Sequence, residues 1–363
     1  MSNARRMTGM ALAASIVAAV SIVARPPTPA AAADVQPAPP AIVPRTGAPL
    51  TVPALPSGTL AGPPPTRAQW TPLPCANQTV TANGPFYPGP SASYVYDQTF
   101  SKSYAIPYLP DLTPQGMALW PKWFSDGTPM LVIGMYKDGD SYLVGVDPTT
   151  GGVFGTLRTE PAHFGGIAIV GNWLIAQHEA VDGGEQVRKY RLQDLAAAFE
   201  QSRADGSKPF VKRFGDLQRV YFASFMSEFD GHLWAGHHGG NIDKMYEYSV
   251  SDDGTLTQIG DPWEVPPKID GLVVTADRFI FSSASGTQQS DMTVSMKTHH
   301  LADGHGRCFR TPSMTEGMVL NGDQVYVTFE SGSARYPDAV NRVGNLHTAP
   351  YEKLAALLNP PPR

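Results

Sequence analysis

The chain has 363 residues, a formal net charge of −5 and 42% hydrophobic residues, which is enough apolar material for a core of ordinary size. No run of Lys and Arg with interleaved aromatic residues occurs, so we expect no nucleic-acid partner. Glycine and proline number 35 each, and much of the proline lies in one block, which indicates a linker joined to a turn-rich β domain.

The first 33 residues have the pattern of a secretory signal peptide. Arg5 and Arg6 precede the apolar run Met10–Ala24, and Ala31–Ala33 offers a small-residue cleavage site. An uncleaved membrane anchor is the alternative, but the apolar run is shorter than the roughly twenty residues that a bilayer span needs. We predict an exported, extracellular protein with no transmembrane segment after processing, and the paired arginines leave the general and twin-arginine routes both open.

The next segment, residues 34–70, is rich in Pro, Ala, Gly and Thr and poor in large apolar side chains. Such a segment cannot bury enough surface to offset its ordering entropy, so we predict a disordered linker before a folded domain at 71–359. Cys75 and Cys308 are the only cysteines. In an exported protein we expect one disulfide between them; a metal site or two free thiols is the alternative.

Five similar stretches follow the linker, most clearly Phe164–Ala180, Ile269–Ser283 and Thr315–Ser331. Each has a small or polar residue, then an apolar run, a tight polar turn and a second apolar run. Intervals of roughly 40–50 residues are typical of a four-stranded propeller blade. The sequence therefore predicts an all-β, five-bladed β-propeller. Aligned on their first polar position, the five copies place Gln115, Gly165, Ser224, Asp270 and Glu316 at intervals of 50, 59, 46 and 46 residues.

The fifth blade has no fourth strand of its own. The alternation in Ala92–Phe100 is suited to supply it, and a strand from the opposite end of the domain would remove an open sheet edge. Cys308 would then lie on the outer strand of the fourth blade, close to the segment that carries Cys75. A sixth blade built from 75–112 is the alternative. The expected strands are 130–135, 142–146 and 153–157 in blade one, 186–191 and 211–214 with an inserted helix at 194–202 in blade two, 245–250 in blade three, 292–297 and 307–310 in blade four, and 317–320, 324–329 and 342–347 in blade five, before a helix at 351–358.

Equivalent positions in different blades converge, because the innermost strands of a propeller line its central channel. Four carboxylates and two histidines at such positions predict a polar, acidic site at the channel mouth. Taken singly, each residue could instead cap a turn or lie in a solvated loop. The starts of the innermost strands carry Gln115, His163 with Gly165, Ser224, Asp270 and Glu316, and the ends of the second strands carry Tyr136, Glu179, His238, Ala284 with Ser285, and Glu330.

Several chemistries suit this set. Asp270 and Glu316 would supply hard oxygen ligands to Ca²⁺, whereas histidine with carboxylates would suit Zn²⁺. Without a metal, Glu316 or Glu330 with a raised pKa would act as a general acid, and a second carboxylate or His163 as the base. Substrate contacts would come from Gln115, Tyr136, Glu179 and His238. The sequence has no dinucleotide-binding glycine pattern and no phosphate-binding Gly-Lys-Ser/Thr motif, so we expect no organic cofactor.

The leading hypothesis is an exported enzyme of hydrolase, lyase or cyclotransferase type that acts on a small polar substrate. The alternative is a non-catalytic propeller that binds a ligand or a cell-envelope glycan through loops such as His237–Gly240. In either case we expect a monomer.

Two stretches, Leu112–Met117 and Asp140–Val153, resemble the first blade of the plant-type glutaminyl cyclotransferases, which are five-bladed propellers. The resemblance covers about forty residues and implies a cyclotransferase activity. The Glu-Ser pair of that family occurs here only in the fifth blade, at Glu330–Ser331. The Glu-Gly and Asp-Gly pairs at the blade starts are also similar to those of calcium-dependent lactonases and strictosidine-synthase-like propellers, which implies that Glu316 and Asp270 hold a metal ion.

Overall fold

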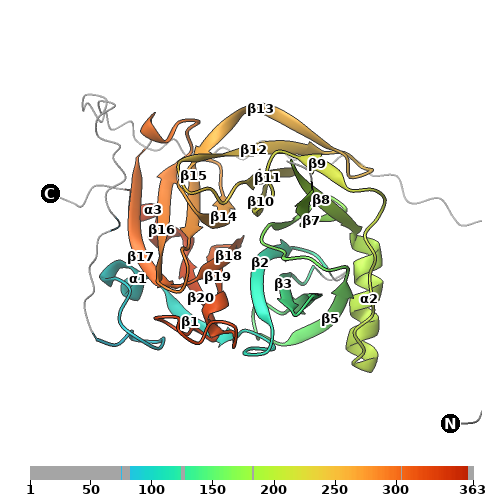
Figure 1. Cartoon of the computed structure of the whole chain (residues 1–363), viewed down its shortest axis with the longest axis horizontal. Coiled ribbons are helices and arrows are strands. Elements are labelled where there is room, and N and C mark those ends of the chain that lie inside the picture. Colours follow the sequence, from blue (N-terminus) through green and yellow to red (C-terminus); the bar gives the residue numbers. More distant parts are fainter. Residues whose placement is uncertain (1–74, 76–81, 124–126, 182–183, 304, 359–363) are drawn as a thin grey trace, which may run out of the picture. The chain divides into compact units, whose positions relative to one another are not determined.

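A computed structural model describes residues 75, 82–123, 127–181, 184–303 and 305–358. The predicted signal peptide and linker lie outside the described residues. Within them the chain forms five antiparallel four-stranded sheets in a ring, a five-bladed β-propeller as predicted (Figure 1).

In each sheet the strand that comes first in the order below is the innermost, and successive innermost strands contact one another around the axis. Blades one and two are β2 (Thr113–Trp120), β3 (Met130–Lys137), β4 (Asp140–Val146), β5 (Val153–Thr159), and β6 (Ile167–Val170), β7 (Trp173–Val181), β8 (Gly184–Arg191), β9 (Gln218–Val220). Blades three and four are β10 (Phe225–Phe229), β11 (His232–Gly236), β12 (Asp243–Val250), β13 (Leu256–Val265), and β14 (Ile269–Val274), β15 (Arg278–Ser283), β16 (Gln289–Met296), β17 (Gly306–Ser313). Blade five is β18 (Thr315–Asn321), β19 (Gln324–Phe329), β20 (Asn345–Pro350) and β1 (Ser101–Ala105), with a short 3₁₀ turn at Glu330–Gly332 and a C-terminal helix α3 (Tyr351–Ala356). Another 3₁₀ turn, Leu301–Asp303, connects β16 to β17 in blade four.

The ring is closed by a strand from before the first blade, as expected, but a different segment supplies it. β1 pairs antiparallel with β20, while most of the predicted strand Ala92–Phe100 is the helix α1 (Tyr94–Thr99). Ser93 caps this helix, since its hydroxyl accepts a hydrogen bond from Tyr96 N at 3.1 Å. Tyr96 and Thr99, three residues apart, are the buried positions, so the period is helical rather than alternating.

The second blade also differs from the sequence prediction at its outer edge. The predicted inserted helix is α2 (Leu192–Asp205), which packs on β5 through Phe199 and ends at Gly206 with φ +71°. Its outer strand is β9 rather than 211–214, because the chain leaving α2 joins the first blade instead: Val211 N donates to Arg158 O at 2.8 Å. None of the helices in the described part of the chain is long and apolar enough to cross a membrane.

Apolar clusters fill the spaces between neighbouring blades. Blades one and two share a cluster around Phe164 and Phe199, and blades three and four share one around Trp234 and Phe281. Because each strand buries one set of side chains on either face, burial runs through β3 and β19 with almost no alternation. This two-sided packing holds the innermost strands at fixed positions around the axis.

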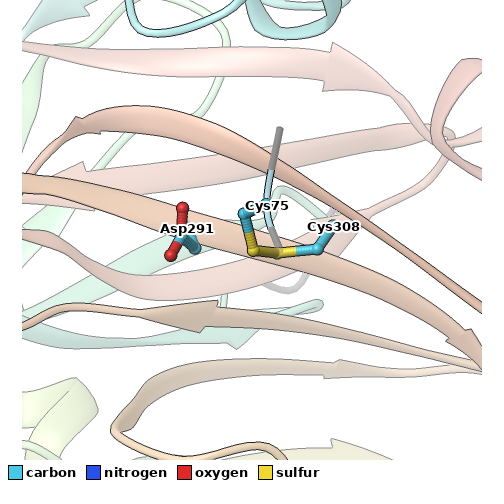
Figure 2. Close-up of side chains that lie close together, drawn as sticks. All are labelled: Cys75, Asp291 and Cys308. Atoms are coloured by element: carbon cyan, nitrogen blue, oxygen red, sulfur yellow. A yellow bond between two sulfur atoms is a disulfide. The ribbon is translucent and has the colours of Figure 1, made fainter. Parts of the chain in front are cut away.

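The predicted disulfide is confirmed. Cys75 and Cys308 are joined, with their Cα atoms 4.7 Å apart, and Cys308 lies on β17, the outer strand of the fourth blade (Figure 2).

A lysine is enclosed by aromatic rings where the third and fourth blades meet. The Lys297 ammonium lies 4.2 Å from the ring centroid of Trp234, 4.9 Å from Phe229, and 5.7 Å from both Trp263 and Phe279. Burial lowers the pKa of this amine. The ring quadrupoles attract the cation and offset part of that desolvation cost.

We expect Lys297→Gln to lower the free energy of unfolding by about 1–2 kcal/mol, because the uncharged side chain loses the cation–π attraction. Lys297→Arg keeps a cation in the cage and should retain most of the stability. Urea titration monitored by tryptophan fluorescence measures both. Equal losses in the two variants would show that side-chain shape, not charge, holds this contact.

A second buried basic group lies on β20. The His347 ring is fully buried against Phe329, Tyr87 and Tyr96, and its Nδ1 lies 2.6 Å from the Tyr96 hydroxyl. Burial, with a smaller contribution from the Lys102 charge, lowers the pKa of His347 to about 3. The imidazole is therefore neutral at every pH at which the protein is expected to work.

Because His347 is buried in its neutral form, we expect the free energy of unfolding to fall in acid. Its folded pKa lies below the unfolded value near 6.5, so the unfolded chain binds more protons between these values and stability falls as the pH drops below 6.5. At pH 5 the loss is about 2 kcal/mol. His347→Gln keeps an acceptor for Tyr96 but cannot gain a proton, so its urea midpoint should change less between pH 7 and pH 5 than that of the wild type. Parallel pH curves would contradict this account.

Candidate functional site

Three blades begin with the same backbone irregularity. The pairing of the innermost strand with its neighbour shifts between Pro114 and Met117 in β2, between Ile269 and Gly271 in β14, and between Thr315 and Met318 in β18. A β-bulge turns a side chain away from the regular alternation of a strand. The residues displaced in this way include Gln115, Asp270 and Glu316, which are the polar residues of the sequence alignment.

The glycine after each polar residue is needed to close the ring. A Cβ at Gly116 would lie 2.3 Å from the carbonyl oxygen of Gly165, and one at Gly271 would lie 2.3 Å from that of Glu316. A Cβ at Gly317 would lie 2.5 Å from Met117 N. The repeated glycine is therefore explained by close approach of neighbouring innermost strands, and this approach brings the polar residues before it together.

Blades four and five also share an unusual backbone conformation before the acidic residue. Lys268 and Met314, each two residues before the acidic residue, have φ of +58° and +56°, a region that side chains other than glycine rarely adopt. Their carbonyl groups accept hydrogen bonds from Ala284 N and Glu330 N, both at 3.1 Å. Because the two turns are the same, Asp270 and Glu316 leave them at equivalent positions.

The carboxyl cluster consists of Asp270, Glu316 and Glu330. Glu316 is 6% exposed and Glu330 9%, and among the described residues the Glu316 carboxyl has no side-chain or backbone hydrogen-bond donor. Burial, with repulsion from Asp270 and Glu330, raises the pKa of Glu316 well above its usual range. Burial raises the pKa of Glu330 to about 7, although the Gln115 amide donates a short hydrogen bond to Glu330 Oε1. The surroundings of Glu316 thus favour its protonated form, while Glu330, with a pKa of about 7, is poised between its two forms at neutral pH.

The third member of the carboxyl cluster is paired with a histidine. His238 Nδ1 lies 2.7 Å from Asp270 Oδ1, and Ala284 N donates to Asp270 Oδ2 at 2.9 Å. The hydrogen bond that the His238 ring donates to Asp270 raises the pKa of His238, and burial raises that of Asp270 in spite of the histidine. Both shifts favour a proton held within the pair.

Aromatic residues form one side of the rim. Tyr136 is 9% exposed, its ring centroid is 4.9 Å from that of His163, and the Arg335 guanidinium lies 5.2 Å from the Tyr136 ring. The Tyr336 hydroxyl donates to Glu330 Oε1 at 3.5 Å. His163 itself is exposed, so the structure places it at the rim, beside Tyr136, rather than in the carboxyl cluster.

The second and third blades contribute less to the centre. Gly165 has no side chain, and the Ser224 hydroxyl donates to Glu185 Oε1 at 3.3 Å. Glu179 lies on β7, but its side chain is outside the described residues. Glu185, whose pKa is raised by burial, was not a predicted site residue, because it lies on the third strand, β8, at a position that the repeat alignment does not single out.

Several acceptors near the carboxyl cluster are unsatisfied. Gln115 Oε1, Gln177 Oε1 and the Tyr136 hydroxyl are buried and have no partner with hydrogen-bond geometry, although Tyr336 is close enough to lower the Tyr136 pKa. A buried acceptor without a donor costs free energy, which a ligand with N–H or O–H groups would recover.

The donors of the carboxyl cluster suit calcium chemically, since they are hard oxygens joined by the free Gln115 Oε1. However, the carboxyl oxygens of the cluster are farther apart than the ligand atoms of a formed metal site. Among the described His, Cys, Asp and Glu residues, only Cys75, Asp291 and Cys308 bring three ligand atoms within 4.8 Å of one another (Figure 2). The two sulfur atoms of that group form the disulfide and are not thiolates.

Further along the axis the polar lining gives way to an apolar cavity of about 150 Å³. Each innermost strand contributes to it, beginning two residues after the polar position at Met117 and Met318. Its polar lining side chains are Ser227 and Glu228. The carboxyl cluster therefore lies at one end of an axis whose continuation is apolar.

No protein-family profile matches the chain, and no curated protein matches it. Among solved structures, the β-propeller domain of Cps50 (Swd1) from Myceliophteria thermophila is 14% identical with a TM-score of 0.31, and the match covers 64% of this chain and 66% of that one. TolB from Acinetobacter baumannii is 10% identical with a TM-score of 0.31, over 65% of this chain and 54% of that one. BamB from Moraxella catarrhalis is 10% identical with a TM-score of 0.29, over 69% and 98%. The matches span less than two thirds of Swd1 and TolB. The likeness concerns the propeller fold alone.

Proposed function

We propose that the protein is an exported enzyme that performs acid–base chemistry on a small polar substrate at the carboxyl cluster. The observation that carries the proposal is the convergence of Asp270, Glu316 and Glu330 with the unsatisfied Gln115. A buried acidic group without a hydrogen-bond partner destabilises a fold, and such groups are typical of sites selected for function.

In this proposal Glu316 is the general acid, because burial and the neighbouring carboxyl groups favour the protonated form of its carboxyl. Glu330 is the base, since a pKa of about 7 gives it both an adequate ionised fraction and a driving force for proton transfer. Tyr336 and Gln115 hold Glu330 in place through their hydrogen bonds. The His238–Asp270 pair is a second proton reservoir, and His163 contacts the substrate from the rim.

The chemistry fits hydrolase, lyase and cyclotransferase reactions alike, since each needs one proton donated and one removed. A Ca²⁺ ion held by Asp270, Glu316 and Gln115 Oε1 is the second candidate, favoured by the mutual repulsion of the three carboxyls. It would supply Lewis-acid polarisation of a substrate oxygen. Export is supported by the signal-peptide pattern and by the disulfide, which persists in oxidising compartments.

The test is a turnover screen on the purified mature chain with chromogenic glycosides, lactones and glutaminyl peptides. Activity on one class, lost in both Glu316→Gln and Glu330→Gln but kept in Glu160→Gln, supports the proposal. Glu160 is a suitable control because its carboxylate already accepts hydrogen bonds from Arg213, away from the axis. The pH profile should have a limb near 7. Ligand binding without turnover in any class would favour the non-catalytic propeller instead.

A further inference from the structure

An aromatic platform lies beside the carboxyl cluster where the second and third blades meet, and Tyr221 is its exposed ring. It consists of Tyr221, Phe222, His237 and Tyr246. Tyr221 stacks on Tyr246 with ring centroids 4.4 Å apart and planes 14° apart, and Phe222 stacks on His237 at 4.6 Å and 20°. Tyr221 is nonetheless 57% exposed, so one of its faces is covered by protein while much of the side chain remains open to solvent.

The platform is held rigidly. Tyr221 N donates to the Tyr248 hydroxyl at 3.2 Å, and Ala223 N donates to the Glu185 carboxylate. On the other side, His237 Nδ1 lies 2.7 Å from Asp243 Oδ2. These hydrogen bonds fix the backbone at Tyr221 and Ala223 and the ring of His237 before any ligand arrives, which reduces the ordering cost of binding.

The platform is continuous with the candidate site. Phe222 and Ala223 lead directly into Ser224, the start of the innermost strand of this blade. His237 is followed by His238, whose ring is paired with Asp270 of the carboxyl cluster at 2.7 Å. A ligand that lies on Phe222 and His237 would therefore have the carboxyl cluster close to one of its ends.

The charges around the platform indicate which class of ligand would stack on its rings. Nucleobases arrive with phosphates, and proteins that stack them surround the rings with Lys and Arg. Here the Asp243 carboxylate contacts His237 and raises the pKa of Tyr246, the Glu185 carboxylate acts on the neighbouring Tyr248, and the chain as a whole is acidic. Carbohydrates fit better. A pyranose ring has an apolar C–H face that packs on an aromatic ring and a hydroxyl edge that hydrogen-bonds carboxylates and imidazoles.

We infer that the substrate is a carbohydrate chain, with one sugar unit stacked on the aromatic platform while the next reaches the carboxyl cluster. This inference rests on the proposed function for its chemistry, since a pair of carboxyl groups is the usual machinery for cleaving a glycosidic bond. Tyr136 and Tyr336 offer a second set of rings on the opposite rim, beside Glu330. The chain would then cross the mouth from blade three towards blades one and five.

The test uses the mature chain carrying Glu316→Gln, so that bound sugar is not turned over. Soluble tetra- to hexasaccharides of glucose, mannose, xylose and N-acetylglucosamine are titrated by calorimetry. We expect at least one series to bind, and Tyr221→Ala to weaken that binding roughly three- to tenfold. Tyr221→Phe keeps the ring and should bind as before. Tyr94→Ala is the matched control, because Tyr94 is 56% exposed and lies on α1, remote in sequence from the platform.

The outcomes separate the two proposals. Oligosaccharide binding that depends on Tyr221, with no cleavage by the wild-type chain, would retain the carbohydrate ligand and overturn the enzyme. Turnover of a lactone or a peptide that Tyr221→Ala leaves unchanged would retain the enzyme and overturn the carbohydrate. Binding of none of the series, or equal binding by Tyr221→Ala and Tyr94→Ala, would overturn the inference directly.

Discussion

Replacing Glu316 with glutamine is expected to stabilise the protein above pH 7 and to leave its stability near pH 4.5 almost unchanged. The wild-type carboxyl is buried beside Asp270 and Glu330, so ionising the cluster places like charges together in a region with little water. Glutamine has nearly the same shape as the protonated acid and cannot ionise. The variant therefore avoids a cost that the wild type meets only as the pH rises.

The direction of this change in stability with pH follows from the raised pKa values of the cluster. A group whose folded pKa exceeds its unfolded value contributes stability that is fully present below the unfolded pKa and is lost as the pH rises to the folded pKa. For Glu330 this window runs from about 4.5 to about 7 and corresponds to about 3 kcal/mol. Glu316 has a raised folded pKa as well, and glutamine removes its titration from both the folded and the unfolded chain, so we expect Glu316→Gln to recover on the order of 2–3 kcal/mol at pH 8.

Urea denaturation at pH 4.5, 6 and 8 in the presence of EDTA measures the effect. Glu160→Gln should instead be less stable than the wild type at pH 8, because the Glu160 carboxylate is stabilised by Arg213 and has no neighbouring acid in the carboxyl cluster. If Glu316→Gln were instead less stable than the wild type at pH 8 once Ca²⁺ is added, a bound cation would be neutralising the cluster, and the metal-assisted version of the proposed function would replace the metal-free one.

The architecture could be predicted because the blades are repeats. The interval between Asp270 and Glu316 equals the length of a blade, and the glycine after each has a steric reason that any blade start shares. Repetition therefore indicated both the ring and which residues face its axis. The same reasoning failed for the closing strand, because the alternation around Tyr94 and Tyr96 fits a strand as well as a short capped helix.

The candidate site was only partly predictable, for a related reason. Gln115, Glu316 and Glu330 do come together, and their alignment positions are what identified them. Tyr336 and Arg335 could not be found this way, since they lie in a loop of blade five that has no counterpart in the alignment. A repeat shows what all blades share, whereas the features that give one blade a function are departures from it.

Loss of the disulfide is expected to have the largest effect on stability. Cys308→Ser should lower the free energy of unfolding by about 5–6 kcal/mol in the chain-entropy account, because Cys75 and Cys308 are 233 residues apart and the bond restricts nearly the whole unfolded domain. The bond ties the N-terminal segment to β17, whereas β1 from that same end of the domain pairs with β20 of the neighbouring blade. Reduction would thus release a constraint near the place where the ring is closed.

The measurement is urea unfolding of Cys75→Ser, Cys308→Ser and the double variant, each compared with the oxidised wild type. Since all three remove one bond, their losses should agree rather than add. A clearly larger loss in Cys308→Ser would mean that the side chain on β17 packs in its own right, beyond the bond it forms. A loss below about 1 kcal/mol in every variant would mean that β1 and α1 close the ring without help from the disulfide, and the entropic account would then be wrong for this domain.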